Sequence, residues 1–194
     1  MEKRLFLTGV SGRGKSTMIE NALGASLVNA GGFITRRVLR GDGSLEGFDL
    51  YPAAAAAGVD GFEPSRFLDY TVTPPTHDNE VFRGVAVRLL EEAQYYSFAV
   101  LDEIGGFEML IPQFRAALGN FFNAGVPCIG VLKGSKNASE LRRSFGLGDR
   151  YDAQLTNLRK VLEADADTLI LEISGWDDKR ALDAVQKWVS EYAK

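Results

Sequence analysis

The stretch TGVSGRGKST, residues 8–17, places three glycines beside a lysine and several hydroxyl side chains. The spacing G-x-x-x-x-G-K-S/T is satisfied by Gly9, Gly14, Lys15 and Ser16. A short apolar run typical of a strand, residues 4–8, precedes the motif, and an amphipathic segment typical of a helix, residues 15–30, follows it. Such a loop turns backbone N–H groups inward and adds the positive end of the helix dipole. The stretch therefore predicts a site for a nucleotide phosphate.

Each position of this loop has an expected task. Lys15 can reach the β- and γ-phosphates of a bound triphosphate, and the Ser16 hydroxyl is placed to ligate Mg²⁺ between them. Thr17 is placed to donate to the α-phosphate. The predicted nucleotide-binding residues are Gly9, Ser11, Gly12, Arg13, Gly14, Lys15, Ser16 and Thr17. An ordinary glycine-rich turn is the alternative, which the full motif and its strand-to-helix context disfavour.

A second motif, SFAVLDEIGGFEML, covers residues 97–110 and consists of an apolar strand that ends in two carboxylates. Asp102 is expected to orient Mg²⁺, and Glu103 to activate an attacking water. Without the upstream loop, a solvated strand end or a helix cap would be the default interpretation. The motif also matches D-x-x-G of switch GTPases. Their base-reading N/T-K-x-D is missing from the comparable segment VLKGSKNASE, residues 131–140, so guanine-specific switching is disfavoured.

Composition limits the classes of protein that fit the chain. Its 194 residues and 45% hydrophobic content predict one globular domain, residues 1–194. A formal charge of -4 argues against nucleic acid as a partner. The single cysteine, Cys128, permits no internal disulfide and no zinc cluster, which fits a reducing cytoplasm. No apolar run is long enough to span a membrane, so a soluble protein is expected.

The apolar pattern alternates between strands and helices along the chain. Two strand-like runs, residues 32–39 and 45–51, flank the turn GDGS and predict an inserted β-hairpin. Residues 66–72 give a weaker strand signal. Later helical periods cover residues 81–93, 111–124, 138–145, 154–163 and 177–193, with strands at 98–101, 127–132 and 168–173. The prediction is an α/β three-layer sandwich whose mainly parallel sheet has helices on both faces.

Four segments together resemble a known family: FLTGVSGRGKST, GGFITRR with GFDL after a glycine turn, VLDEIGGFEML, and IGVLKGS. They are similar to the small nucleoside-triphosphatases first described from thermophiles, also called cancer-related nucleoside-triphosphatases. The resemblance spans about residues 3–173, and its specific parts are GF-x-T after the first helix and D-E-I-G-x-x-E after the third. It implies a recombinase-like P-loop fold that slowly hydrolyses several nucleoside triphosphates with Mg²⁺.

The resemblance also implies roles by position. Lys15 and Ser16 bind phosphate and metal, and Asp102 orients the metal. Glu103 is the catalytic glutamate, with Lys15 as the second catalytic residue, and Glu108 is the trailing acid of the motif.

The chain departs from the family pattern at two places. Arg36 and Arg37 stand where the family usually has acidic residues, and only Lys133 and Lys136 match its later basic segment.

Several other side chains have competing interpretations. A lid over the nucleotide and a solvated basic surface both fit the arginines Arg142, Arg143 and Arg150. Edge protection of the hairpin is slightly favoured over a catalytic role for Arg36, Arg37 and Arg40. His77 is expected in a loop or a helix cap. Core packing is expected for the aromatic residues Trp176, Trp188, Phe121 and Phe122, whereas the candidates for stacking on a base are Tyr51, Phe62 and Tyr70.

The sequence thus favours a Mg²⁺-dependent nucleoside-triphosphate hydrolase of ATP, GTP and other triphosphates. Two alternatives remain at this point. One is a kinase whose small acceptor binds near residues 52–75, and the other is a nucleotide-dependent switch or interaction module.

Overall fold

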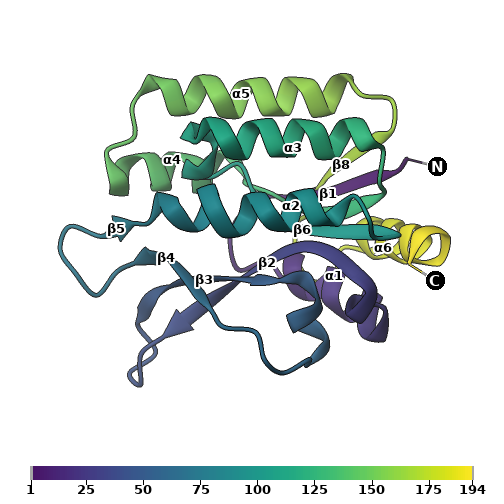
Figure 1. Cartoon of the computed structure of the whole chain (residues 1–194), viewed down its shortest axis with the longest axis horizontal. Helices are drawn as coiled ribbons and strands as arrows, with labels where there is room; N and C mark the ends of the chain where they lie inside the picture. Colours follow the sequence, from purple (N-terminus) through teal and green to yellow (C-terminus); the bar gives the residue numbers. More distant parts are fainter. Residues whose placement is uncertain (1, 194) are drawn as a thin grey trace.

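The computed structural model describes residues 2–193, and its centre is one eight-stranded sheet (Figure 1). The strand order is β5-β4-β3-β2-β6-β7-β1-β8. The strands are β1 (Arg4–Thr8), β2 (Ala30–Leu39), β3 (Leu45–Pro52), β4 (Ser65–Asp69), β5 (Thr76–His77), β6 (Phe98–Ile104), β7 (Cys128–Leu132) and β8 (Thr168–Glu172).

The sheet has a parallel block and an antiparallel extension. Strands β2, β6, β7, β1 and β8 pair in parallel, and β3, β4 and β5 continue the sheet antiparallel beyond β2. Strand β7 lies between β1 and β6. The glycine loop after β1 and the carboxylates of β6 therefore come from strands that are separated by one strand. The predicted β-hairpin is confirmed as β2 and β3.

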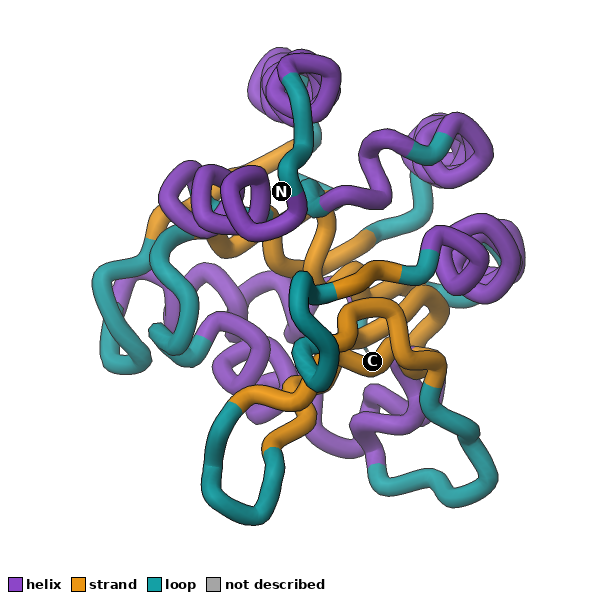
Figure 2. Tube along the Cα trace, turned by 90° about the vertical axis from the view of Figure 1, so that its left-hand side faces the viewer, coloured by secondary structure: helices purple, strands orange, loops and turns teal. Residues whose placement is uncertain are grey.

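Helices cover both faces of the sheet, as Figures 1 and 2 show. The α-helices are α1 (Lys15–Leu23), α2 (Val87–Ala93), α3 (Pro112–Ala124), α4 (Ser135–Phe145), α5 (Asp149–Ala164) and α6 (Lys179–Tyr192). Shorter turns of helix are η1 (Gly24–Asn29), η2 (Ala53–Ala57), the π-helical η3 (Val81–Ala86) and η4 (Phe107–Leu110). Across residues 2–193 none of these helices combines the length and apolarity that crossing a bilayer requires.

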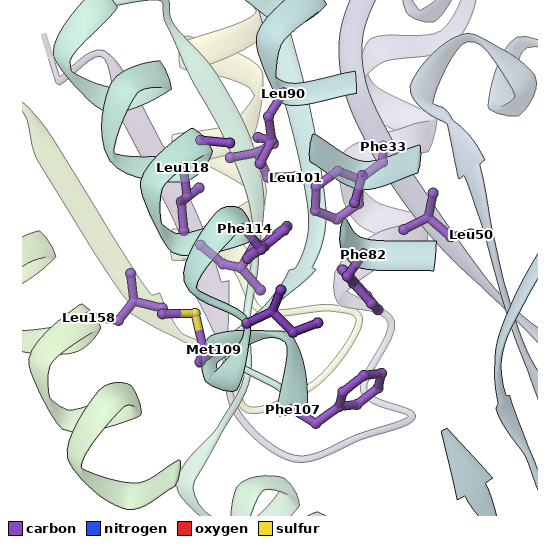
Figure 3. Packing of buried hydrophobic residues seen from close by; sticks show 14 of the residues in the cluster. Phe33, Leu50, Phe82, Leu90, Leu101, Phe107, Met109, Phe114, Leu118 and Leu158 are labelled. Atoms are coloured by element: carbon purple, nitrogen blue, oxygen red, sulfur yellow. The ribbon is translucent and has the colours of Figure 1, made fainter. Parts of the chain in front are cut away.

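Each face of the sheet has its own hydrophobic core. In β1, Phe6 points into the core under α2, α3 and α5, while Leu5 and Leu7 point into the core under α1 and α6. This alternation is the period of two that a strand covered on both faces requires. The first core is rich in aromatic rings, among them Phe33, Phe82 and Phe114 (Figure 3). The predicted three-layer α/β architecture is therefore confirmed.

The first helix ends earlier than the sequence predicted. It stops at Leu23 because Gly24 adopts a positive φ of 50°, and the 3₁₀ turn η1 follows. The Gly31-Gly32 pair that follows lies inside β2. A methyl group on Gly32 would lie 2.2 Å from the Val100 carbonyl oxygen of β6, so glycine is needed for this close approach.

Three further expectations are corrected. Edge protection by the hairpin arginines is wrong for Arg36, because β2 is an inner strand and Arg36 forms a two-point ion pair with Glu20 of α1, at 2.6 and 2.9 Å. His77 is neither in a loop nor a cap. It forms part of edge strand β5 and stacks near Phe107, with ring centroids 4.6 Å apart. Trp176, expected in the core, is 75% exposed.

The close approach of β2 and β6 gives a stability prediction. Gly32→Ala is expected to destabilise the protein by more than about 2 kcal/mol, because φ is +83° and the added methyl meets backbone. Urea denaturation monitored by circular dichroism measures this loss. Gly84→Ala is the control, since open space surrounds Gly84 and its φ is not positive, and it should be neutral or stabilising by up to about 1 kcal/mol. Equal midpoints for the two variants would contradict the packing argument.

Candidate active site

The predicted site residues meet at the carboxyl edge of the parallel strands. The glycine loop joins β1 to α1, Asp102 and Glu103 lie near the end of β6, and Lys133 directly follows β7. In open α/β sheets this edge is where ligands bind. The arrangement follows from topology, because parallel strands deliver all their carboxyl ends to one side.

The glycine loop owes its shape to three positive φ angles, 122° at Gly9, 76° at Gly12 and 81° at Gly14. The Lys15 ammonium lies beneath the loop and donates to the carbonyl oxygens of Gly9 at 3.1 Å and Val10 at 2.8 Å. Burial lowers the pKa of Lys15, and the nearby carboxylates of β6 act in the opposite direction. The Lys15 ammonium has therefore lost part of its hydration on folding. A bound anion can offset that cost in free energy.

Ser16 and Asp102 connect the two motifs directly. The Ser16 hydroxyl donates to Oδ1 of Asp102 at 3.0 Å. Asp102 is buried, and within residues 2–193 its Oδ2 has no hydrogen-bond partner. Burial, followed by the charge of Glu103, raises the pKa of Asp102 to about 7. A buried carboxylate oxygen without a donor, beside a hydroxyl, fits a hard divalent cation, which prefers oxygen ligands.

Glu103 points toward the half-buried Lys133. Its Oε1 lies 3.3 Å from the Lys133 ammonium in an ion pair. Burial acts to lower the pKa of Lys133, but the carboxylates of Glu103 and Glu108 outweigh it and leave this pKa above its ordinary value. Lys133 is therefore positively charged, and it holds the Glu103 carboxylate at the edge of the site.

Glu108 performs a structural task. Its Oε1 accepts hydrogen bonds from the backbone N–H groups of Gly105 and Gly106, each at 2.7 Å. The Tyr151 hydroxyl of α5 donates to the Gly105 carbonyl at 2.9 Å. These contacts fix the loop that follows the two carboxylates of β6, so the trailing acid of the motif orients its leading acids.

Sequence reasoning missed one side chain at the glycine loop. Asn137, on the first turn of α4, accepts from the Ser11 backbone N–H at 3.2 Å and donates to the Gly9 carbonyl at 3.3 Å. The signal was a polar side chain just beyond the carboxyl end of a strand, within VLKGSKN. Only the fold shows that this strand, β7, lies beside β1.

The arginines considered for a lid are held elsewhere or exposed. Arg142 forms ion pairs with Asp149 and Asp152 of α5, each at 2.7 Å, and so ties α4 to α5. Arg143, Arg150 and the loop residue Arg13 are exposed. The structure therefore does not bring these arginines together with the carboxylates of β6.

Two depressions flank the glycine loop. One, of about 470 Å³, is lined by Gly12, Gly14, Thr17 and the exposed Trp176. The other, of about 250 Å³, is lined by Ser11 and by Glu103 and Lys133 among others. The loop thus separates a depression lined by Trp176 from a second one that contains the Glu103–Lys133 ion pair.

Comparison with known proteins identifies the family. The model of the NTPase family matches residues 4–164, which is most of the chain. The chain belongs to this family. The resemblance found in the sequence, and with it the enzyme class of nucleoside-triphosphatases, is confirmed.

Relatives and solved structures agree with this assignment. The chain is 31% identical over 139 residues to the nucleoside-triphosphatase THEP1 of Thermotoga sp. (strain RQ2), covering 69% of this chain and 76% of that protein. THEP1 of Thermotoga maritima is 30% identical with the same coverage. The solution structure of a human cancer-related nucleoside triphosphatase aligns with a TM-score of 0.63 at 20% identity, over 98% of this chain and 99% of that one. This last similarity shows the fold.

The Asn137 contacts give a binding prediction. Asn137→Ala is expected to weaken binding of a non-hydrolysable triphosphate about three- to tenfold, because two hydrogen bonds that order the loop are lost. Isothermal titration calorimetry measures the change. Lys136→Ala, an exposed position on the same turn, is the matched control and should bind like the wild type. Identical affinities for both variants would show that the loop does not need Asn137.

Proposed function

We propose that this protein hydrolyses nucleoside triphosphates to diphosphate and inorganic phosphate in a Mg²⁺-dependent reaction, with Glu103 as general base. The observation that carries the proposal is the contact between the two motifs, in which the Ser16 hydroxyl lies 3.0 Å from Asp102. Ser16 and Asp102 are 86 positions apart in the sequence, so their contact depends on the fold.

The loop is proposed to bind the phosphates through its backbone N–H groups and through side chains, Lys15 and Thr17 among them. Lys15 binds the β- and γ-phosphates, exchanging its contacts to the Gly9 and Val10 carbonyls for phosphate oxygens. Thr17 is exposed at the start of α1 and donates to the α-phosphate. The other proposed contacts come from Gly9, Ser11, Gly12, Arg13, Gly14 and Ser16.

Ser16 and Asp102 are the residues proposed to hold the metal. The buried, unpaired Oδ2 of Asp102 supports this role, since a cation would supply the charge that the site lacks there. When bound, Mg²⁺ neutralises charge on the β- and γ-phosphates. Ser16 and Asp102 would hold the metal from the two motifs, which their hydrogen bond already aligns.

Glu103 is the proposed base. Its carboxylate takes a proton from water as the water oxygen bonds to the γ-phosphorus, and the bond to the β–γ bridging oxygen breaks. The diphosphate leaves with the electron pair of that bond. The ion pair with Lys133 keeps the Glu103 carboxylate oriented for this transfer. Lys15, as the second catalytic group, stabilises the charge that develops on the bridging oxygen.

The base of the nucleotide is proposed to stack on Trp176. This side chain is 75% exposed and shares a depression with Gly12, Gly14 and Thr17, the end of the loop that meets the α-phosphate. Stacking tolerates every base, so broad selectivity is expected. The missing N/T-K-x-D motif points the same way.

The remaining expectations are also proposals. The acidic balance of -4 supports the absence of nucleic-acid binding. A single buried cysteine, Cys128, fits a cytoplasmic protein. One sheet that includes strands from Arg4 to Glu172 supports a single domain.

Substitutions of Glu103 and Asp102 are expected to have different effects on the reaction. Glu103→Gln should still bind the Mg²⁺-triphosphate complex and lose roughly 10²–10⁴ in kcat, because the proton acceptor is gone. Asp102→Asn should instead raise the Mg²⁺ concentration needed for half-maximal rate. A phosphate-release assay across a Mg²⁺ series measures both effects, with the exposed Glu163→Gln as control. Wild-type turnover by Glu103→Gln would place water activation elsewhere.

Base recognition gives a separate prediction. The kcat/KM values for ATP and GTP should differ by less than roughly tenfold, about 1.4 kcal/mol. Trp176→Ala should weaken both nucleotides alike, by about 1–3 kcal/mol. Tyr95→Ala is the control, because Tyr95 is 83% exposed but lines a different depression. A preference above about a thousandfold would require a base-reading hydrogen bond and exclude simple stacking.

A further inference from the structure

The pocket beside Glu103 is larger than a hydrolase needs. It has a volume of about 250 Å³, whereas a single attacking water occupies about 30 Å³. Its lining includes Glu103, Lys133 and Ser11. The pocket therefore adjoins the reacting end of the proposed phosphate site and has room for a second molecule.

The nucleotide itself does not account for this pocket. In the proposed pose the α-phosphate lies at Thr17 and the base lies at Trp176, in the other depression. The γ-phosphate lies at the opposite end of the loop, toward Glu103. A triphosphate extended along the loop therefore leaves the Glu103 pocket open, with its mouth facing the γ-phosphorus.

The walls of the pocket specify the chemistry of an occupant. About half of the lining residues are apolar or aromatic, among them Phe48, Phe67, Phe82 and Phe107, and the others are mostly polar or charged. These rings pack edge to face, with centroids 5.1 Å apart for Phe67 and Phe82 and 5.3 Å apart for Phe82 and Phe107 (Figure 3 labels the latter two). Such packed rings form a rigid slot that suits a small ring system.

The inserted part of the sheet builds this slot. Thr35 comes from β2, Phe48 from β3 and Phe67 from β4, while α4 closes the opposite side with Leu141 and Ser144. Strands β3 and β4 do not contribute to the glycine loop or to the carboxylate pair. A pocket explains what this insertion adds to a phosphate-binding sheet.

We propose that the pocket binds a small ring-containing alcohol, and that the hydroxyl of this alcohol accepts the γ-phosphoryl group. This inference rests on the proposed triphosphate site. The alcohol oxygen bonds to the γ-phosphorus, the bond to the β–γ bridging oxygen breaks, and the diphosphate leaves with its electron pair. The hydroxyl proton goes to the Glu103 carboxylate, so the reaction yields a phosphate ester and a nucleoside diphosphate.

Lys133 and Asn137 position the groups that take part in the transfer, which are the Glu103 carboxylate and the glycine loop. The Lys133 ammonium holds Glu103 at 3.3 Å, and Asn137 contacts both the loop and the pocket. A ring held against the phenylalanines orients its hydroxyl toward Glu103 and displaces water from the carboxylate. When no alcohol is bound in the pocket, water accepts the phosphoryl group and the reaction is hydrolysis.

Four probes test the proposal. Benzyl alcohol, 2-phenylethanol and 4-pyridinemethanol carry a ring and a hydroxyl, and benzyl methyl ether has a similar ring without a transferable proton. Titration followed by ¹H–¹⁵N NMR reports binding through amide shifts at Phe67, Tyr70 and Phe107. Reaction with Mg²⁺-ATP followed by ³¹P NMR separates the phosphate ester from inorganic phosphate.

We expect the alcohol to receive a much larger share of the phosphoryl group than random partition between alcohol and water would give. At 10 mM alcohol in water, chance alone would give about 0.02% ester, whereas a bound acceptor should receive at least about a tenth of the transferred phosphate. Benzyl methyl ether should shift the same amides and give no ester. The proposal would be overturned if none of the probes shifted the amide signals of the pocket. It would also be overturned if the alcohols bound but no phosphate ester formed.

Two tryptophan substitutions on α4 provide the matched comparison. Ser144 lines the pocket and is exposed, so Ser144→Trp fills the slot without burying a large side chain in the core, and it should reduce the ester fraction at least about tenfold. Ser139 is exposed on the same helix and does not line the pocket, so Ser139→Trp should keep the wild-type partition. An equal ester fraction in both variants would overturn the assignment of the pocket.

Failure of the proposed hydrolase has a different signature. If the triphosphate site is wrong, the wild-type protein transfers phosphate neither to water nor to alcohol, and the transfer step falls with it. If only the acceptor site is wrong, inorganic phosphate is released at one rate whether or not alcohol is present. Ester formation that replaces inorganic phosphate supports the inference.

Discussion

The site depends on one constraint, which is that opposite charges are held out of water at a single edge of the sheet. Burial lowers the pKa of Lys15 and raises that of Asp102, so each group is pushed toward its neutral form. A triphosphate with a divalent cation brings the complementary charges to both groups. Binding of such a ligand is therefore favourable, because folding has already removed much of the water around both groups.

The same edge is organised by contacts that contribute no chemistry themselves. Glu108 and Tyr151 hold the loop after β6, and Asn137 holds the glycine loop from the side of β7. These contacts come from elements that are adjacent only in the folded sheet. They define the separation between Glu103 and the phosphate loop, and a shift of about an ångström there would reduce the rate substantially.

The antiparallel strands β3, β4 and β5 add a wall to the site at the edge of the parallel strands. They extend the sheet and supply the aromatic wall beside Glu103. A P-loop sheet without this wall would expose its carboxylate to solvent. With the wall, aromatic side chains lie beside the Glu103–Lys133 ion pair, as the proposed organic acceptor requires.

The sequence by itself determined the local features: the glycine loop, the carboxylate pair, the hairpin and the alternation of strands and helices. These follow from short-range spacing, which backbone geometry and side-chain periodicity dictate. The pairing of Lys133 with Glu103, the contact of Asn137 with Ser11 and the exposure of Trp176 were decided only by the tertiary structure. The physical reason for the two contacts is strand order, because placing β7 between β1 and β6 brings together side chains that no sequence period connects.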